Sequence, residues 1–230
     1  MRRALQALLL AGCVCAWPDP AAAQDTITDE RVWFTLNLQE RGSPDSPWRW
    51  TFETIFRSRD GVNELDTFSV RPTVIYSLDK HSSVGGGYAF APMFPPVVGT
   101  IIEQRAYGQY GFTSGLAGGT FSCRIRLEAR FIEGNDGTLM RLRNQARYTH
   151  AIHRGSRLSW MAYDELSLHL NDTRLRAQGV DQNRLFGGLQ IAAWPAGRVE
   201  AGYLNQFLPG LRGTADRMNH VLSTVLAISF

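Results

Sequence analysis

The sequence predicts an all-β protein: a closed antiparallel transmembrane β-barrel of 10–12 strands, with no transmembrane helix. Three observations predict this fold class. Polar and apolar residues alternate with a period of two in segment after segment. The 22 glycines and the 6 Trp, 7 Tyr and 12 Phe suit many short strands and turns. After the N-terminus, no run of about 18 apolar residues occurs, as a membrane-spanning helix would require.

Composition excludes several other classes of protein. With 44% hydrophobic and 20% charged residues, the 230-residue chain has too ordinary a composition for a disordered protein. Its net charge of +3 gives no reason to expect nucleic-acid binding. We find no phosphate-binding loop, zinc-ligand spacing or dinucleotide motif, so we predict no cofactor and no metal site.

The first 23 residues have the features of a secretory signal peptide. A short basic start precedes residues 4–17, in which Gln6 is the only polar side chain, and an Ala-x-Ala site follows at residues 21–23. We therefore predict a cleaved signal peptide over residues 1–23 and one outer-membrane barrel domain over residues 24–230.

A second interpretation of the N-terminus stays open. Leu10-Ala11-Gly12-Cys13 matches the pattern of bacterial lipoprotein processing, which would leave Cys13 as an acylated first residue. If cleavage follows Ala23 instead, Cys123 is the one cysteine left in the mature chain, and it predicts neither a disulfide nor a metal site.

The clearest strand lies at residues 121–131. Apolar side chains occupy every odd position from Phe121 to Phe131, whereas Ser122, three arginines and Glu128 occupy the even positions. A helix would spread these arginines around its whole circumference, so the pattern predicts a strand with one apolar and one charged face.

Similar alternation gives eleven candidate strands in all. Asp164 falls on the apolar face of its segment, which predicts a bulge or a change of phase there, and Gly85–Gly87 weaken another candidate. In chain order the candidates are 31–41, 48–57, 68–77, 82–91, 101–113, 121–131, 140–148, 157–170, 184–193, 199–206 and 219–230.

Bacterial single-chain barrels have even numbers of strands, so we expect the count of eleven to be wrong by one, with the error near the N-terminus. Short turns at 79–82, 153–156 and 194–197 alternate with longer loops at 91–100, 132–138, 170–182 and 208–217. Short periplasmic turns and long outer loops would explain that alternation.

The alternation alone does not separate a membrane barrel from a soluble periplasmic β-protein, which remains an alternative. Segments of about ten residues, with aromatic side chains near their ends, favour a membrane crossing. The chain ends on Phe230, with Ile228 and Leu226 on the same apolar face, and this resembles the signal read by the barrel-assembly machinery of Gram-negative bacteria. We therefore expect an outer-membrane location, with membrane lipid and that machinery as partners.

Several short motifs together resemble one family. They are Glu103-x-Arg105, Arg124-x-Arg126-x-Glu128-x-Arg130, Arg141-x-Arg143, Asp164-Glu165, Asp181-Gln-Asn-Arg184, Glu200-Ala-Gly-Tyr203-Leu-Asn-Gln206 and Asn219-His220. In this order they resemble the predicted outer-membrane barrel family called domain of unknown function 2490. The resemblance implies a bacterial outer-membrane barrel and implies no reaction.

The inward faces of the candidate strands carry the charged residues that we consider most relevant to function. Arginine suits such an interior because its planar fork binds several carboxylates and keeps its charge. Two interpretations follow: a structural plug of side chains, or a narrow porin-like path that favours an anionic solute or lipid headgroup. The predicted interior charge network consists of Glu53, Arg71, Glu103, Arg105, Arg124, Arg126, Glu128, Arg130, Arg141, Arg143, Arg147, Glu165, Arg184 and Glu200, together with Arg57.

An enzyme of another class is the remaining alternative, because some outer-membrane barrels hydrolyse lipids with Ser and His. Tyr163, Glu165, Ser167 and His169 share one strand face, but side chains at i and i+2 point in parallel and do not converge. No Gly-x-Ser-x-Gly elbow occurs. We therefore predict no catalytic residue.

Overall fold

The protein is described by a computed structural model that covers residues 26–43, 45–174, 176–210 and 214–230. The predicted signal peptide, the cleavage site after Ala23 and Cys13 lie outside the described residues. None of the residues described belongs to a helix with the length and apolar character that a membrane crossing requires.

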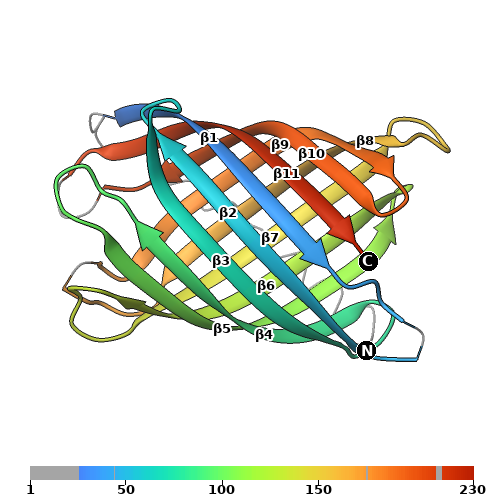
Figure 1. Cartoon of the computed structure of the whole chain (residues 1–230), viewed down its shortest axis with the longest axis horizontal. Coiled ribbons are helices and arrows are strands. Elements are labelled where there is room, and N and C mark those ends of the chain that lie inside the picture. Colours follow the sequence, from blue (N-terminus) through green and yellow to red (C-terminus); the bar gives the residue numbers. More distant parts are fainter. Residues whose placement is uncertain (1–25, 44, 175, 211–213) are drawn as a thin grey trace.

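Eleven strands form one closed barrel, with each strand beside its neighbours in sequence (Figure 1). The predicted all-β closed barrel is thus confirmed. The strands are β1 (Thr26–Gln39), β2 (Trp48–Arg59), β3 (Glu64–Ser77), β4 (Ser82–Met93), β5 (Ile101–Leu116), β6 (Gly119–Ile132), β7 (Leu139–Ala151), β8 (Leu158–His169), β9 (Gly179–Trp194), β10 (Gly197–Leu208) and β11 (Asp216–Ser229).

The barrel closes where β1 meets β11, and this one pairing is parallel, from Thr26 beside Asp216 to Gln39 beside Ser229. All other neighbouring strands pair in antiparallel fashion. Our expectation that the strand count had to be even is wrong. An odd barrel closes without an edge when its first and last strands run in the same direction, and β1 is a full strand that begins at Thr26.

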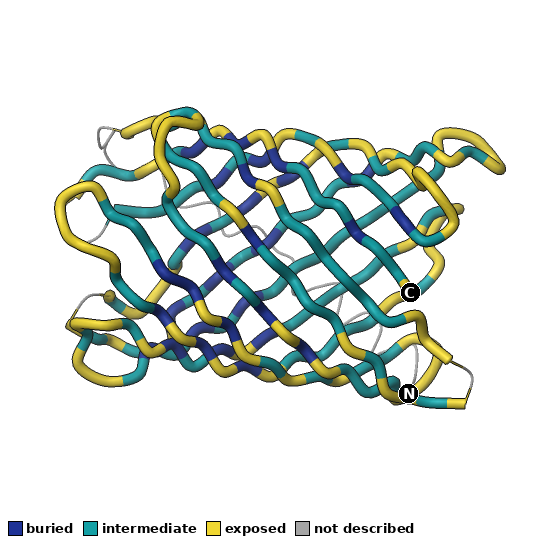
Figure 2. The backbone as a smooth tube through the Cα atoms, viewed as in Figure 1, coloured by how far each residue is buried: buried dark blue, intermediate teal, exposed yellow. Residues whose placement is uncertain are grey.

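The barrel is polar inside and apolar outside along much of its length, as β6 shows. Leu127 is 44% exposed, although its neighbours Arg126 and Glu128 are only 3% and 1% exposed. Figure 2 shows buried positions recurring along the middle of the strands between more exposed ones. Because successive side chains of a strand point to opposite faces, the charged residues face the lumen and the apolar residues face outward.

Aromatic rings form contacts on the outward face near one end of the barrel. Trp48 lies against Tyr76 with ring centroids 4.8 Å apart, and Trp50 lies 5.1 Å from Phe230. On the other side of the barrel, Tyr148 contacts Trp160 at 5.3 Å. The ends of β2, β3, β7, β8 and β11 thus carry a partial aromatic belt at one level.

We call this end the short-turn end, because four of its five connections are short: 78–81, 117–118, 152–157 and 195–196. In the 117–118 turn both residues have positive φ, 46° for Ala117 and 79° for Gly118, as a tight hairpin with right-handed twist requires. In the 78–81 turn, the backbone N–H groups of His81 and Ser82 donate to Asp79, which lowers the pKa of that carboxyl below its usual value.

The opposite end, which we call the long-loop end, carries connections 60–63, 94–100, 133–138, 170–178 and 209–215. β1 begins at the long-loop end and β11 finishes at the short-turn end (Figure 1). The predicted alternation of short turns and longer loops is therefore present from β3 onward, while the 40–47 and 60–63 connections depart from it.

Two irregular segments differ from our expectations. β8 keeps its register through Asp164, and the predicted bulge lies later, between Ser167 and Leu168. Asp164 lies on the outward face, as the unbroken alternation of β8 requires, and Asn183 of β9 donates a hydrogen bond to it at 2.7 Å. The glycine-rich segment at 85–87 is part of β4 and pairs with both β3 and β5.

Candidate functional site

The structure places all of the predicted charged residues on the lumen side of the barrel, and most of them are buried. They come from β2, β3 and β5 to β10, so the site is built by the strands and not by the loops. Each predicted glutamate forms an ion pair with at least one arginine. Three of these glutamates, Glu103, Glu128 and Glu165, are the centres of the network.

Glu103 of β5 is the first of these centres and is fully buried. Arg105 donates to both of its carboxylate oxygens, at 2.8 and 2.7 Å, and the Arg130 Nε atom of β6 also donates to it. Two arginines on one carboxylate leave net positive charge at this position.

Glu128 of β6 is the second centre. Arg141 donates to one of its oxygens, with the Nε contact at 2.9 Å, and Arg143 donates to the other oxygen at 2.9 Å. Arg126 lies farther away, with 3.9 Å between the charged atoms. Arg141 also reaches Asp181 of β9 at 2.9 Å, which links this centre to the next strands.

Glu165 of β8 is the third centre. Arg143 donates to both of its oxygens at 2.7 and 2.8 Å, Arg184 of β9 donates at 3.1 Å, and Arg124 of β6 at 3.3 Å. Because Arg143 contacts Glu128 and Glu165 at once, the second and third centres form one continuous network from β6 to β9.

The other predicted residues form separate pairs. Arg71 donates to Glu53 at 2.9 Å, and Arg147 of β7 donates to Glu200 of β10 at 2.7 Å although β8 and β9 lie between them. Arg57 differs from these, because no ion pair is found for it among the described residues; its guanidinium lies over the ring of Trp33 at 4.4 Å.

Sequence reasoning missed several inward polar residues. His169 lies 3.1 Å from Arg130 and 3.4 Å from Asp181, and neither it nor Asp181 belongs to the predicted network. Across β9, β10 and β11, Asn219 donates to Gln206 and Gln206 donates to Gln182, which makes a buried row of amides. The sequence did contain a signal for four of these residues, since Asp181, Gln182, Gln206 and Asn219 all belong to the motifs that carried the family resemblance.

The lumen also contains an apolar cluster, which the sequence did not lead us to expect. Five buried side chains from β1 and β8 to β11 pack together there, with Tyr163 against them; they are Trp33, Met161, Phe186, Leu204 and Val221. The rings of Tyr163 and Phe186 are stacked with centroids 4.9 Å apart. One side of the interior is therefore packed like a small hydrophobic core, and the other is filled by ion pairs.

A cavity of about 230 Å³ lies inside the barrel between the charged network and the long loops. Nine arginines and three carboxylates line it, together with Trp33, amide side chains and a few apolar ones. The arginines are Arg31, Arg57, Arg105, Arg130, Arg141, Arg143, Arg176, Arg184 and Arg217, and the carboxylates are Asp66, Glu103 and Asp181.

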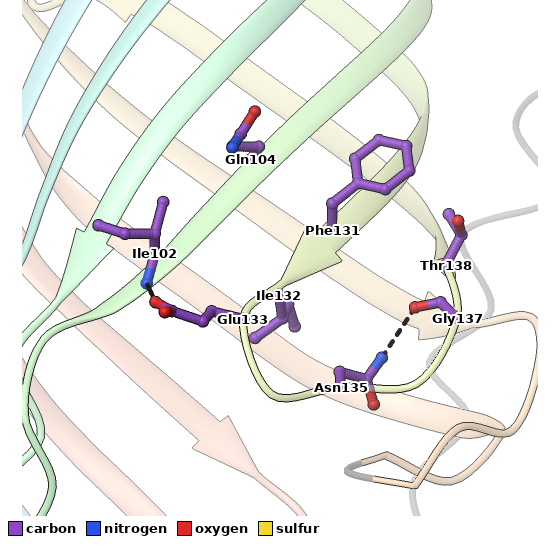
Figure 3. Close-up of a pocket in the computed structure, with 8 residues that line it drawn as sticks. All are labelled: Ile102, Gln104, Phe131, Ile132, Glu133, Asn135, Gly137 and Thr138. Carbon is purple, nitrogen blue, oxygen red and sulfur yellow. Dashed lines mark hydrogen bonds between the residues drawn. The ribbon is translucent and has the colours of Figure 1, made fainter.

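A larger and more open hollow lies outside this network, where the 133–138 loop joins β6 to β7 (Figure 3). Its carboxylate, Glu133, accepts a hydrogen bond from the backbone N–H of Ile102 at 3.1 Å, and Asn135 donates to the carbonyl of Gly137 at 3.1 Å. These contacts stabilise the loop, and the remaining lining is largely apolar, so we assign no chemistry to the hollow.

The hydrolase alternative gains no support from the geometry of the residues described. Ser167 is buried, and its hydroxyl has no hydrogen-bond partner among them, while His169 contacts Arg130 and Asp181. His220 lies on the outward face, where it shares a hydrogen bond of 2.6 Å with the Tyr203 hydroxyl. No serine is brought to a histidine in these contacts.

Comparison with known proteins gives one match. A family model described as a protein of unknown function (DUF2490) matches residues 30–219. No curated protein and no solved structure matches the chain. The match covers β2 to β10 completely, and with them every member of the predicted charge network.

Proposed function

Since this chain belongs to the DUF2490 family, whose function is unknown, we propose that it is a bacterial outer-membrane β-barrel with a lumen filled by side chains. Its role is structural, and its interior network locks the strands together. The short-turn end faces the periplasm and the long-loop end faces outward, as in other barrels of this kind.

One observation carries the proposal: the burial pattern is inverted relative to a water-soluble protein. Buried arginines and glutamates occupy the lumen, while exposed Leu, Val, Phe and Trp side chains cover the outside on almost every strand. A soluble barrel with such an outer surface would expose an apolar area far larger than monomers tolerate. In a bilayer the same surface contacts lipid, and the closed barrel satisfies the backbone hydrogen bonds.

The direct test is heat-modifiable migration on a gel together with extraction of membranes by carbonate. A folded barrel should migrate differently before and after boiling, and the protein should stay in the carbonate-resistant outer-membrane fraction. Release by carbonate would overturn the proposal and favour the soluble periplasmic alternative.

A narrow anion-favouring path is the second candidate, and the excess of arginines around the inner cavity favours it. A filled lumen should give no channel events in planar bilayers. Small events whose reversal potentials show anion selectivity would establish the second candidate instead, and cation selectivity would exclude both.

Leu127→Arg should distinguish a membrane barrel from a soluble one. Leu127 lies on the outward face at the middle of β6, so an arginine there would face the bilayer interior and lower the free energy of unfolding by about 2–4 kcal/mol. The measurement is urea unfolding of the protein in phospholipid vesicles. Val97→Arg, in the exposed 94–100 loop, is the control and should change nothing. Equal stability of the Leu127 variant would argue for a water-exposed outer face.

Removal of Phe230 should reduce barrel assembly in cells several-fold, with much less effect on refolding in detergent. Its ring contacts Trp50, and its carbonyl accepts a hydrogen bond from the backbone N–H of Arg41 at 2.8 Å. The measurement is the fraction of the protein in outer membranes that is heat-modifiable. Phe112→Ala, which removes another aromatic ring from the short-turn end, is the control. Equal losses for both variants would show that Phe230 acts only through packing.

A further inference from the structure

Trp33 and two arginines form an unusual cluster at the inner cavity. The indole of Trp33 is 5% exposed, with the Arg57 guanidinium 4.4 Å and the Arg184 guanidinium 5.0 Å from its ring. Arg57 comes from β2, Trp33 from β1 and Arg184 from β9, so the cluster joins both sides of the seam between β1 and β11. All three residues line the cavity.

These groups hold hydrogen-bond donors that the described residues do not use. The Trp33 Nε1, Arg57 Nε and Arg184 Nε atoms are buried and have no partner there. A buried donor without an acceptor costs about 1–3 kcal/mol, more when it is charged. Arg57 donates no hydrogen bond to any described residue, so its guanidinium, which lines the cavity, requires an acceptor from outside the chain or from solvent.

The charge of Arg57 is also uncompensated, whereas Arg184 shares Glu165 with Arg143 and Arg124. The three carboxylates that line the cavity are each held by other arginines: Asp66 by Arg31, Glu103 by Arg105 and Arg130, and Asp181 by Arg141. Arg57 forms no ion pair with any described carboxylate, and three further arginines, Arg105, Arg143 and Arg184, line the same cavity. A small anion is the species that would satisfy both the donors and the charge.

We propose that Arg57, Arg184 and the indole N–H of Trp33 form a binding site for a small oxyanion of the phosphate type. The guanidiniums supply forked donors and charge, and Trp33 supplies one further donor and a surface on which both guanidiniums stack.

Cavity size favours a free anion over a lipid headgroup as the source of the phosphate. About 230 Å³ accommodates phosphate with a few waters, and the closed ring of strands around the cavity leaves an acyl chain no sideways exit from the barrel. The site goes beyond the structural role and does not depend on where the barrel resides.

The test is calorimetric titration of the purified full-length protein in detergent with inorganic phosphate, at constant ionic strength and with chloride as the reference anion. We expect saturable phosphate binding that chloride does not reproduce. Arg57→Met should weaken it roughly tenfold to a hundredfold, because a charged hydrogen bond and its charge are lost. Trp33→Phe, which removes the indole N–H and keeps a ring, should weaken it severalfold.

Arg59→Met is the matched control, because Arg59 lies on the same strand, pairs with Glu64 and does not line the cavity. It should bind phosphate like the wild type. Heat-modifiable migration shows whether each variant is folded. If Arg57→Met does not fold, Trp33→Phe and the wild-type comparison of phosphate with chloride still test whether the phosphate site exists.

Three results would overturn the site: no saturable binding by the wild type, equal heats with chloride, or unchanged affinity in Arg57→Met. Competition by phosphatidylglycerol in mixed micelles, without competition by glycerol phosphate, would show that a headgroup is the ligand and overturn the free-anion assignment. Loss of phosphate binding in a barrel that remains heat-modifiable would leave the proposed structural role intact.

Discussion

Glu128→Ala should lower the free energy of unfolding of the barrel by about 3–5 kcal/mol, the loss expected when one partner of a buried ion pair is removed. Glu128 is 1% exposed and accepts hydrogen bonds from both Arg141 and Arg143. Without it, two neighbouring guanidiniums stay buried with less opposing charge, and they repel each other. Urea unfolding in vesicles or detergent, followed by tryptophan fluorescence, measures the loss.

The matched control for this variant is Glu64→Ala. Glu64 also pairs with an arginine, Arg59, but its side chain is half exposed, so the loss should stay below about 1 kcal/mol. Adding Arg141→Met to Glu128→Ala should recover part of the stability, since it removes one of the uncompensated charges. Equal effects of Glu128→Ala and Glu64→Ala would show that the lumen is hydrated and that its network contributes little.

Gly202→Val should destabilise the barrel by about 3 kcal/mol or more through overpacking. Gly202 of β10 faces the lumen beside Gly188 of β9, and the ring of Phe186 covers both glycines. A Cβ atom on Gly202 would lie 2.4 Å from the Gly187 carbonyl oxygen and 2.5 Å from the Gly188 Cα atom. These are backbone atoms of the neighbouring strand, so the strands themselves would have to separate.

Gly187→Val tests the same change on the opposite face. Nothing lies within 4 Å of a Cβ atom on Gly187, which faces outward, and valine suits a strand better than glycine. This variant should be as stable as the wild type or slightly more stable in the same urea experiment. If both valine variants lose equal stability, the close approach of β9 and β10 at Gly202 does not exist.

Period-two alternation was sufficient to predict the strands and the direction of their side chains. In β6 and β7 the rule predicts the charged side chains correctly, and Arg126, Glu128, Arg141 and Arg143 all face the lumen as expected. The rule works because each strand has one face toward lumen side chains and one face away from them, whatever the register of its neighbours. It needs only local sequence.

Pairing between strands could not be predicted in the same way. Arg147 binds Glu200, three strands away, and Arg143 bridges Glu128 and Glu165, because partners inside a barrel depend on how far each strand is shifted along the next. The expectation of an even strand number failed for a related reason. The parallel pairing of β1 with β11, which closes a barrel of eleven strands, depends on the whole chain and not on local sequence.

The apolar side of the lumen was missed because our rule treated the interior as polar. On β9 and β10, Phe186 and Leu204 face inward, while Leu185 and Tyr203 face outward, so apolar side chains occur on both faces of these strands. Alternation of polarity alone therefore could not place Phe186 and Leu204 in the lumen. The inward glycines that make room for Phe186 could have been a signal, since glycine within a strand often marks a close approach.

The seam between β1 and β11 determines the order in which the barrel can close. Its paired residues, from Thr26 with Asp216 to Gln39 with Ser229, are 190 positions apart in the sequence, whereas the other strand pairs are successive hairpins. Contacts between residues so far apart in sequence form slowly, because the chain loses the conformational entropy of loop closure before it gains the energy of the contact. Until the seam forms, β1 and β11 both present unpaired edges that can associate with other chains. A factor that shields these two edges would therefore raise the yield of closed barrels without changing the stability of the folded protein.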